Sequence, residues 1–417
     1  MNLKGKKLLV LGGKPIGSCE IVEFAKAHGA YTIVADYLPK DLSAAKKLAD
    51  EAWDVSTGDV DKLVDMAKAA GVDGLYAGVH EFNIAKMIEV CQLAGLPCYC
   101  SLEQWNQLVD KRRFKHLCMQ YGIPVAKEYK IQTPEDIDHE EIDYPVIIKP
   151  ADGSGSRGFA ICTNAAELKS AFPAAVDASD TGHVLVEQKM DYKNSAIINY
   201  TIFDGDVVFS GISDKHSEKV FEDGSPVMSV QFYPSLFERE YLSSLDEKAK
   251  TMLKGMGLKN GVLWVEAFCK DGQFTFNEAG YRFGGSLTYY PVERIYGVQQ
   301  LGTQIEYALT GAYSEPLIEE RHYDKVYTIM PVHVKPGKIV SIEGLELLEK
   351  NPEWLHYVPV HFIGDEIKNW GSAQQVLAYI HYETNTREES GAFADEILKT
   401  LSVKGEQGED LLFNLYR

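Results

Sequence analysis

The residues most suggestive of chemistry are two glutamates on a strand–turn–strand pattern. Glu266 and Glu278 flank a turn at residues 270–272. With a two-residue turn, Glu266 would pair with Asn277, and Glu278 would face the other side of the hairpin. With a three-residue loop that ends in glycine, Glu266 would pair with Phe276, and Glu278 would lie diagonally across on the same face, about 7–8 Å away. We favour this second register because it lets both carboxylates converge on one cation.

The surroundings of the two glutamates favour a bound ligand over a solvated hairpin face. Aromatic and aliphatic residues fill both strands, from Val262 to Phe268 and again at Phe274 and Phe276. A carboxylate in such a strand needs a partner. Mg²⁺ prefers oxygen ligands and commonly combines one or two carboxylates with the phosphates of a substrate. The hairpin is therefore a candidate magnesium site, with a solvated face as the alternative.

A second candidate site lies upstream, in the stretch IIKPADGSGSRGFAI of residues 147–161. A buried strand delivers Lys149 just before a loop of small residues: Gly153, Ser154, Gly155, Ser156 and Gly158. Such a loop offers backbone N–H groups to phosphate oxygens. It is not a P-loop, because the lysine precedes the glycines and comes from a strand. We expect a phosphate-binding lid, and a mobile surface loop is the alternative.

The elements before these sites alternate between strand and helix. Short apolar runs predict strands, and amphipathic segments that end in glycine predict helices. The expected strands are 6–13, 31–36, 52–56 and 74–78, and the expected helices are 16–28 and 59–70. This alternation is typical of parallel βαβ units in an open, doubly wound sheet.

The first strand ends in a glycine turn that raises the alternative of NAD(P) binding. Gly12, Gly13 and Gly17 follow the strand, and Asp36 stands about 24 residues after the first glycine. The dinucleotide fingerprint is G-x-G-x-x-G, and here Lys14 fills the position of its middle glycine. We favour a tight strand-to-helix turn with a structural role. The alternative is an NAD(P) oxidoreductase in which this turn binds the dinucleotide.

The pattern changes after residue 109. A basic helix begins with Asp110 as its N-cap and ends at Gly122. Strands are expected at 144–150, at 184–190 and as a pair around 195–212. A helix at 300–311 and a mixed strand and helix region from 327 onward complete the chain.

In this order, the motifs resemble the ATP-grasp superfamily, specifically its carboxylate–amine ligases and carbamoyl-phosphate-synthetase-like members. The shared order is a D-K-x-x-F-K helix, a strand lysine, a glycine lid, an acidic hinge, two glutamates and an arginine. The resemblance implies a mixed α/β and α+β chain, with an ATP-grasp fold between a Rossmann-like domain and a C-terminal lobe. The expected domains are a Rossmann-like domain at 1–108, a small lobe with the lid at 109–190, a large lobe with the metal site at 191–314, and a C-terminal α+β domain at 315–417.

The resemblance also implies roles for individual residues. Glu266 and Glu278 match the magnesium ligands, Arg282 matches the arginine that stabilises the transferring phosphoryl group, and Lys215 matches a further lysine on a mobile loop. Glu187 matches a hinge acid near the adenine amino group. The expected ATP-binding residues are Lys111, Lys149, Gly153, Ser154, Gly155, Ser156, Gly158, Glu187, Gln188, Lys189, Met190 and Asn194.

Two positions depart from the family pattern. Gly280 stands between Glu278 and Arg282, where the family has asparagine as a third metal ligand. One magnesium ion would then be held more weakly, or Asn277 or water would replace that ligand. Asn194 stands seven residues beyond the hinge glutamate, where an acid often binds the ribose. An amide also hydrogen-bonds a ribose hydroxyl, so we read this second change as tolerable.

The activity implied by the resemblance is an ADP-forming ligase that activates a small carboxylate as an acyl phosphate and couples it to an amine. Its cofactors would be ATP and two magnesium ions, with Mn²⁺ able to substitute. The alternatives are a bicarbonate-activating enzyme of the carbamoyl-phosphate or purine-pathway type, and a catalytically weak nucleotide-binding protein. The chain lacks the length of a full two-half carbamoyl phosphate synthetase.

The composition sets the remaining expectations. With 417 residues, 45% hydrophobic and 25% charged, we expect several soluble globular domains. The formal net charge of −19 argues against nucleic acid or anionic membranes as partners. No membrane span, signal peptide or C-x-x-C pair is visible, so we expect a cytoplasmic protein with reduced thiols. The resemblance to the ATP-grasp superfamily implies that a homodimer would be ordinary.

Overall fold

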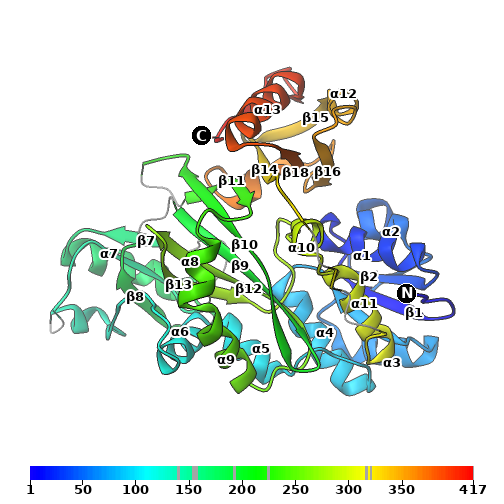
Figure 1. The fold of residues 1–417 in the computed structure, drawn as a ribbon, viewed down its shortest axis with the longest axis horizontal. Helices are drawn as coiled ribbons and strands as arrows, with labels where there is room; N and C mark the ends of the chain where they lie inside the picture. Colours follow the sequence, from blue (N-terminus) through cyan, green and yellow to red (C-terminus); the bar gives the residue numbers. More distant parts are fainter. Residues whose placement is uncertain are drawn as a thin grey trace.

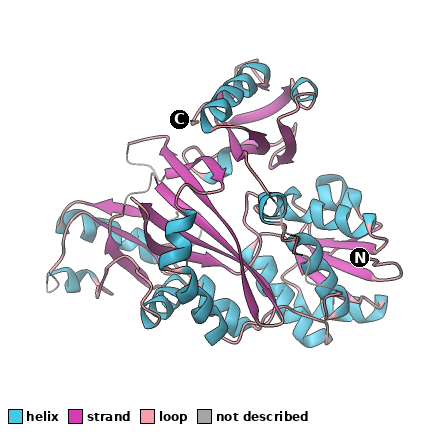
Figure 2. Ribbon diagram, viewed as in Figure 1, coloured by secondary structure: helices cyan, strands magenta, loops and turns pink. Residues whose placement is uncertain are grey.

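The structure is a computed structural model that describes residues 1–138, 141–152, 158–190, 194–222, 226–314, 318–319 and 322–416. The described residues form helices and several separate sheets, as Figures 1 and 2 show. The fold is mixed α/β and α+β, which confirms the predicted fold class.

The N-terminal sheet is parallel, with strand order β3-β2-β1-β4, and helices lie on both sides of it (Figure 1). Its central strand β1 is buried because the sheet is covered on both faces, which agrees with its continuous apolar run. The strand–helix alternation predicted from the sequence is therefore confirmed. The elements are β1 (Lys7–Leu11), α1 (Pro15–Ala27), β2 (Tyr31–Asp36), α2 (Ala44–Leu48), β3 (Glu51–Asp54), α3 (Val60–Ala70), β4 (Gly74–Ala77) and α4 (Glu81–Ala94).

Two helices lead into the next part of the chain. The sequence did not predict α5 (Leu102–Val109), which begins with a capping box between Ser101 and Gln104. Helix α6 (Lys111–Gln120) begins as predicted, because the Asp110 side chain accepts a 2.9 Å hydrogen bond from the backbone N–H of Arg113. Phe114 and Leu117 of α6 are buried.

A small antiparallel sheet follows, with strand order β5-β8-β6-β7. One of its faces is covered by α7 (Ala165–Asp177), whose Leu168 and Phe172 belong to the same apolar core as Val146 and Val186. Its strands are β5 (Glu128–Tyr129), β6 (Val146–Pro150), β7 (Ala160–Cys162) and β8 (Val184–Gln188).

Over the described residues, a nine-stranded sheet forms the rest of the framework, in the order β13-β12-β9-β10-β11-β14-β18-β16, with β20 paired to β14. Its first five strands are β9 (Asn194–Phe203), β10 (Asp206–Lys219), β11 (Pro226–Tyr233), β12 (Gly261–Lys270) and β13 (Gln273–Gly280). The helices of this region are α8 (Glu238–Ser244), α9 (Asp246–Gly255), α10 (Tyr289–Tyr296) and α11 (Gln300–Thr310).

The C-terminal strands continue that sheet, because β11 pairs with β14 through Gln231 and Ile329. The sheet therefore runs across residue 314, where the sequence predicts a domain boundary, and the four-domain division stays a prediction. The elements are β14 (Val326–Val334), β15 (Gly337–Glu343), α12 (Leu345–Leu348), β16 (Trp354–Pro359), β17 (Glu366–Ile367), β18 (Val376–Thr384), α13 (Arg387–Thr400), β19 (Ser402–Gly405) and β20 (Leu412–Phe413). Of the described helices, none is both long and apolar enough to cross a membrane.

Candidate active site

The hairpin of β12 and β13 places Glu266 directly opposite Glu278. Its turn has only two central residues, since Lys270 pairs with Gln273, and both Asp271 (φ 51°) and Gly272 (φ 75°) are left-handed. This is the type I′ pattern of two-residue hairpins. The three-residue loop that we expected is therefore wrong.

The two carboxylates nevertheless share a face, because a β-bulge shifts the register farther along the hairpin. Ala267 pairs with Phe276 and Glu266 with Glu278, which leaves Asn277 as an extra residue on β13. A bulge of this kind bends the strand and re-aims its side chains. As a result, Asn277 and Glu278, although adjacent in sequence, both line the same cavity.

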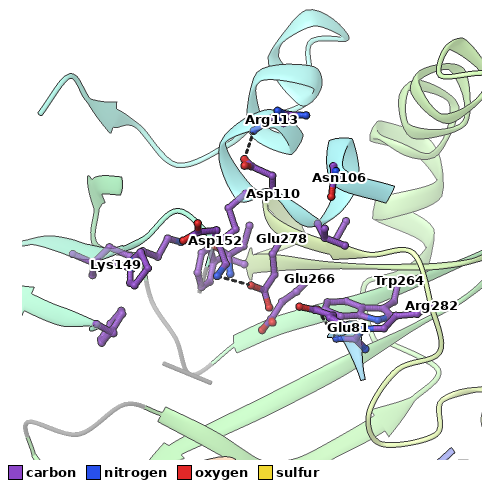
Figure 3. A pocket seen from close by; sticks show the side chains of 18 of the residues that line it. Glu81, Asn106, Asp110, Arg113, Lys149, Asp152, Trp264, Glu266, Glu278 and Arg282 are labelled. Atoms are coloured by element: carbon purple, nitrogen blue, oxygen red, sulfur yellow. Dashed lines mark hydrogen bonds and ion pairs between the residues drawn. The ribbon is translucent and has the colours of Figure 1, made fainter. Parts of the chain in front are cut away.

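That cavity has a volume of about 640 Å³. In Figure 3, Glu266 and Glu278 lie between Lys149 on one side and Trp264, Arg282 and Glu81 on the other. Ile147, Phe159, Trp264 and Phe268 contribute apolar surface, and the polar or charged lining residues are Glu81, Asn106, Asp110, Lys111, Arg113, Lys149, Asp152, Thr181, Lys215, Ser217, Glu266, Asn277, Glu278 and Arg282.

Both hairpin carboxylates face lysines. Lys215 Nζ lies 2.9 Å from Glu266 Oε1, and Lys111 Nζ lies 3.7 Å from Glu278 Oε2. Burial alone would raise the pKa of Glu278, but the charges of Lys111, Lys149, Lys215 and Arg282 outweigh it and hold the pKa below its ordinary value. Glu278 is therefore ionised at neutral pH.

These residues fit a magnesium ion that shares its coordination with phosphate. Two opposed carboxylates, one of them held ionised, supply hard oxygen ligands. Among the residues that the structure describes, no cluster of three or more His, Cys, Asp or Glu side chains could hold a metal. The protein thus offers a partial coordination shell, which substrate phosphates and water would complete.

Lys149, which lines the cavity, also belongs to a buried cluster of charged residues. Its Nζ atom is 2.9 Å from Glu187 Oε2 and 3.4 Å from the side-chain oxygen of Asn277. Glu187 is buried and also bonded to Lys115 of α6. Burial would raise the pKa of Glu187, but Lys149 and Lys115 hold it below the ordinary value. The cluster fixes the strand lysine against its neighbours.

Lys115 was not among the residues singled out from the sequence. It is the second lysine of the D-K-x-x-F-K helix, one turn after Lys111 and next to the buried Phe114, so the motif itself contained the signal. Burial and the charge of Lys149 lower the pKa of Lys115 to about 8.

The predicted hinge and ribose residues lie away from the cavity lining. Gln188 is the last residue of β8, Lys189 and Met190 follow it, and Asn194 is the exposed first residue of β9. The backbone N–H of Lys189 donates to the carbonyl of Pro145 at 3.2 Å. The roles of these residues, and that of Glu187 beside adenine, stay predictions.

The predicted lid lies largely outside the described residues, since Gly153, Ser154, Gly155 and Ser156 are not among them. Gly158 has a φ of 65°, and a Cβ there would come within 2.9 Å of the Ala174 carbonyl oxygen. Only glycine fits this position without strain. The close approach to α7 therefore accounts for that one glycine of the lid.

The expectation that Lys215 lies on a mobile loop is wrong. The residue lies inside strand β10, paired with Ser195 of β9 and Gln231 of β11. Its pKa is raised, because the attraction of Glu266 outweighs the lowering effect of burial. Lys215 is thus a cation on a rigid strand that faces the hairpin.

Arg282 lies at the end of the cavity away from Lys149. One guanidinium nitrogen lies 2.9 Å from Glu81 Oε1, another donates to the carbonyl of Phe283 at 2.9 Å, and the guanidinium carbon is 5.1 Å from the Trp264 ring centre. Glu81 comes from a different part of the chain, the N-terminal sheet region. It is the first residue of α4 and also lines the cavity.

Trp264 explains why glycine replaces asparagine at position 280. The two residues are cross-strand partners, and a Cβ at Gly280 would come within 2.4 Å of the indole. No side chain fits there while Trp264 holds its place. The cavity therefore has an indole wall where the family pattern has a third metal ligand.

The glycine turn after β1 is filled by the protein itself. Asp36 accepts a 2.9 Å hydrogen bond from the Gly13 N–H, and the Ser43 hydroxyl donates to the Gly13 carbonyl at 3.1 Å. A Cβ at Gly13 would lie 2.0 Å from that hydroxyl. With Asp36 engaged and the turn occupied, this geometry argues against dinucleotide binding.

The aromatic pair near α10 belongs to the junction with the C-terminal strands. Tyr289 is buried, and Tyr290 stacks on His356 with ring centres 4.0 Å apart. Arg294 lies 2.7 Å from Glu383 Oε1 of β18. Tyr289, Tyr290 and Arg294 do not line the cavity.

Comparison with known proteins defines the class of this site. The family model of the ATP-grasp domain matches residues 116–286, which span the small sheet and the hairpin. This part of the chain is therefore an ATP-grasp domain, and the resemblance noted in the sequence is confirmed.

Solved structures extend the similarity to the whole chain. Phosphoribosylglycinamide synthetase from Anaerococcus prevotii has 18% identity and a TM-score of 0.74, over 96% of this chain and 100% of that one. L-amino acid ligase from Bacillus licheniformis has 18% identity and a TM-score of 0.77, over 97% and 99%. The biotin carboxylase domain of 2-oxoglutarate carboxylase from Hydrogenobacter thermophilus, described in complex with MgADP and bicarbonate, has 19% identity and a TM-score of 0.77, over 97% and 91%. The chain thus shares the fold of these three proteins.

Proposed function

We propose that the protein is an ATP-dependent, ADP-forming ligase that activates a small carboxylate as an acyl phosphate and joins it to an amine. The observation that carries this proposal is the pair Glu266 and Glu278, directly opposite each other on a cavity that Lys149, Lys111 and Lys215 also line. An ATP-grasp domain with opposed carboxylates and several lysines suits the transfer of a phosphoryl group. The names of the similar structures, a synthetase and an amino acid ligase among them, support the same class.

In the first step, a carboxylate oxygen of the substrate attacks the γ-phosphorus of ATP. The bond from that phosphorus to the bridging oxygen breaks, and ADP leaves with the electron pair. Lys149 and Lys111 stabilise the charge that spreads over the phosphate oxygens, and Arg282 does so from the far end. Magnesium held by Glu266 and Glu278 would supply further charge neutralisation and align the phosphates.

In the second step, the nitrogen of a neutral amine attacks the acyl carbon. The carbon–oxygen bond to phosphate breaks, inorganic phosphate leaves, and the nitrogen loses a proton to solvent. Water would hydrolyse the acyl phosphate, so the apolar lining of Ile147, Phe159 and Phe268 has the task of limiting its access.

The proposal also covers the metal ions, the oligomeric state and the location of the protein. Two magnesium ions with Mn²⁺ as a substitute, a homodimer, and a cytoplasmic location are predictions that accompany the ligase. So are the ATP contacts of the lid, of Glu187 to Met190 and of Asn194.

The test is a screen for ADP release over amino acids, small acids and bicarbonate, each with and without amines. Hydroxylamine in the same mixtures traps an acyl phosphate as a hydroxamate. A hydroxamate that depends on one carboxylate and on Mg²⁺ supports the ligase. ADP release with bicarbonate alone would favour the bicarbonate-activating alternative, and no ADP with any acid would leave a nucleotide-binding protein.

A further inference from the structure

The far end of the cavity combines residues from two separate regions of the chain. Glu81 comes from the start of α4 in the N-terminal sheet region, whereas Trp264 and Arg282 come from β12 and the segment after β13. Figure 3 shows these three side chains together, beyond Glu266 and Glu278 as seen from Lys149. An acceptor that approaches the transferring phosphoryl group from this side would meet Glu81.

Of the acids that line the cavity, Glu81 lies beside Arg282. Asp110 caps α6, and Asp152 accepts hydrogen bonds from Ser179 and from the backbone of Thr181. Glu266 and Glu278 belong to the hairpin site. The Glu81 side chain is 42% exposed and bonds the guanidinium of Arg282 at 2.9 Å.

Together, Glu81 and Trp264 surround a cation on two sides. The guanidinium of Arg282 lies between the Glu81 carboxylate and the Trp264 ring, whose centre is 5.1 Å from its central carbon. A carboxylate and an aromatic face are the two features that stabilise a desolvated cation. The contacts of Arg282 thus mark a place where the cavity stabilises positive charge.

Trp264 is also accommodated by its cross-strand partner. Position 280 is glycine, and a Cβ there would come within 2.4 Å of the indole. An acidic first residue is favourable for a helix by itself, but that preference does not account for its position on the cavity opposite an indole.

We propose that Glu81 and Trp264 form the binding site for the ammonium group of the amine substrate, so that the protein selects cationic primary amines such as amino acids and their derivatives. This inference rests on the proposed ligase function. During phosphoryl transfer Arg282 turns towards the phosphate oxygens, and the ammonium takes its place between the carboxylate and the indole. The ammonium then loses a proton to solvent before its nitrogen attacks the acyl carbon.

The test separates amine binding from carboxylate activation. Acyl phosphate formation is measured by hydroxylamine trapping, since hydroxylamine is an uncharged nucleophile at neutral pH. Amine binding is measured as the KM for a set of L-amino acid amides, which carry an ammonium and no carboxylate to activate. Both assays use the wild-type chain, Glu81→Gln, Trp264→Phe, and the control Glu89→Gln on the same helix.

For Glu81→Gln we expect the KM for the amides to rise roughly 10–100-fold, because a charge-assisted bond to the ammonium is lost. Hydroxamate formation should fall by a clearly smaller factor than amide coupling, since the glutamine still reaches Arg282. Trp264→Phe should raise the same KM by less, about threefold, because the weaker phenyl ring remains. Glu89→Gln should match the wild type in both assays.

Two results would overturn the inference while leaving the ligase intact. In the first, Glu81→Gln lowers hydroxamate formation as much as amide coupling, so Glu81 only positions Arg282. In the second, the wild type forms hydroxamate but couples to no cationic amide, or the KM is unchanged in the variant. A wild type that forms no hydroxamate with any carboxylate would refute the proposed function itself, and this inference with it.

Discussion

Two strands of this chain are followed by glycine-rich sequence, and the described residues around the two segments differ. After β1, the turn at Gly12 and Gly13 is closed by the chain itself: Asp36 accepts from the Gly13 N–H, and the Ser43 hydroxyl fills the space where a ligand would lie. After β6, Lys149 lies on a cavity of about 640 Å³ that also holds Glu266 and Glu278. Glycines after a strand therefore indicate a phosphate site when the residues around them line a cavity and do not fill it.

The two regions also differ in the charged side chains that surround them. Around Lys149, two lysines share Glu187, and further lysines face the hairpin carboxylates. Beside the first turn, Glu20 accepts from the Gly17 N–H at 2.8 Å, and burial raises its pKa to about 7. One region gathers lysines around a cavity that suits an anionic ligand, whereas the other holds an acid whose pKa burial raises to about 7. The following changes test this difference.

The largest effect is expected from Glu278→Ala. Loss of a metal-binding carboxylate should lower the rate of ADP formation by about 10²–10³-fold, because the charge of the transferring group loses its counter-ion. The melting temperature should stay close to that of the wild type, since the side chain lines a cavity. Glu396→Ala, an exposed glutamate of α13, is the control. Full activity in Glu278→Ala would refute the metal site.

Next in size is Lys149→Met. The change removes a lysine that we expect to bind phosphate, and it leaves Lys115 as the remaining one of the two lysines that pair with Glu187. We expect the Kd for ATP, measured calorimetrically, to rise roughly 10–100-fold, as for loss of a charge-assisted bond. Lys127→Met removes an exposed lysine that pairs with Asp143 in the same lobe, and it should have no effect. Equal losses in both variants would mean that the effect is one of general charge.

A pH-dependent effect is expected from Glu20→Gln. The folded pKa of about 7 exceeds the ordinary 4.5, so the folded protein holds a proton there that the unfolded chain has lost. The stability that this proton contributes to the wild type is therefore lost progressively as the pH rises from 4.5 to 7. The variant should gain about 2 kcal/mol relative to wild type at pH 8 compared with pH 5. Urea unfolding at the two pH values measures this gain, and an equal difference at both would contradict it.

The smallest effect is expected from Asp36→Asn. An amide has one acceptor oxygen for the two N–H groups of Gly13 and Leu38, so stability should fall by about 1 kcal/mol. The KM for ATP should be unchanged. NADH should not raise the melting temperature of wild type or variant, whereas ATP with Mg²⁺ should raise that of both. Stabilisation by NADH that disappears in Asp36→Asn would restore the dinucleotide alternative.

The sequence predicted the fold and the ATP-grasp class because both depend on patterns of residue type. Strand and helix alternation identified the N-terminal sheet, and the order of motifs from Lys111 to Arg282 identified the domain that the family model matches. The N-cap at Asp110 is confirmed for the same reason, since it depends on local hydrogen bonding alone.

The geometry of the hairpin could not be obtained from the sequence. The expected three-residue loop was wrong, because the turn has two residues. The expected shared face of Glu266 and Glu278 was nevertheless right, because an unpredicted bulge at Asn277 restores it. Bulges depend on how neighbouring strands pair, which no single segment encodes. Likewise, the packing of Trp264 on Gly280 and the contact of Glu81 with Arg282 join distant segments, so only the folded chain brings them together.

The central claim is that phosphates and metal bind beside Lys149 and not at the first glycine turn. A crystal structure with a non-hydrolysable ATP analogue and Mn²⁺ tests it most directly, because anomalous scattering locates the metal. We expect Mn²⁺ between Glu266 and Glu278, at bonding distance of about 2.0–2.2 Å from a carboxylate oxygen of each, with the phosphates next to Lys149. Metal bound away from both glutamates, or phosphates lying against Gly12 and Gly13, would contradict the account.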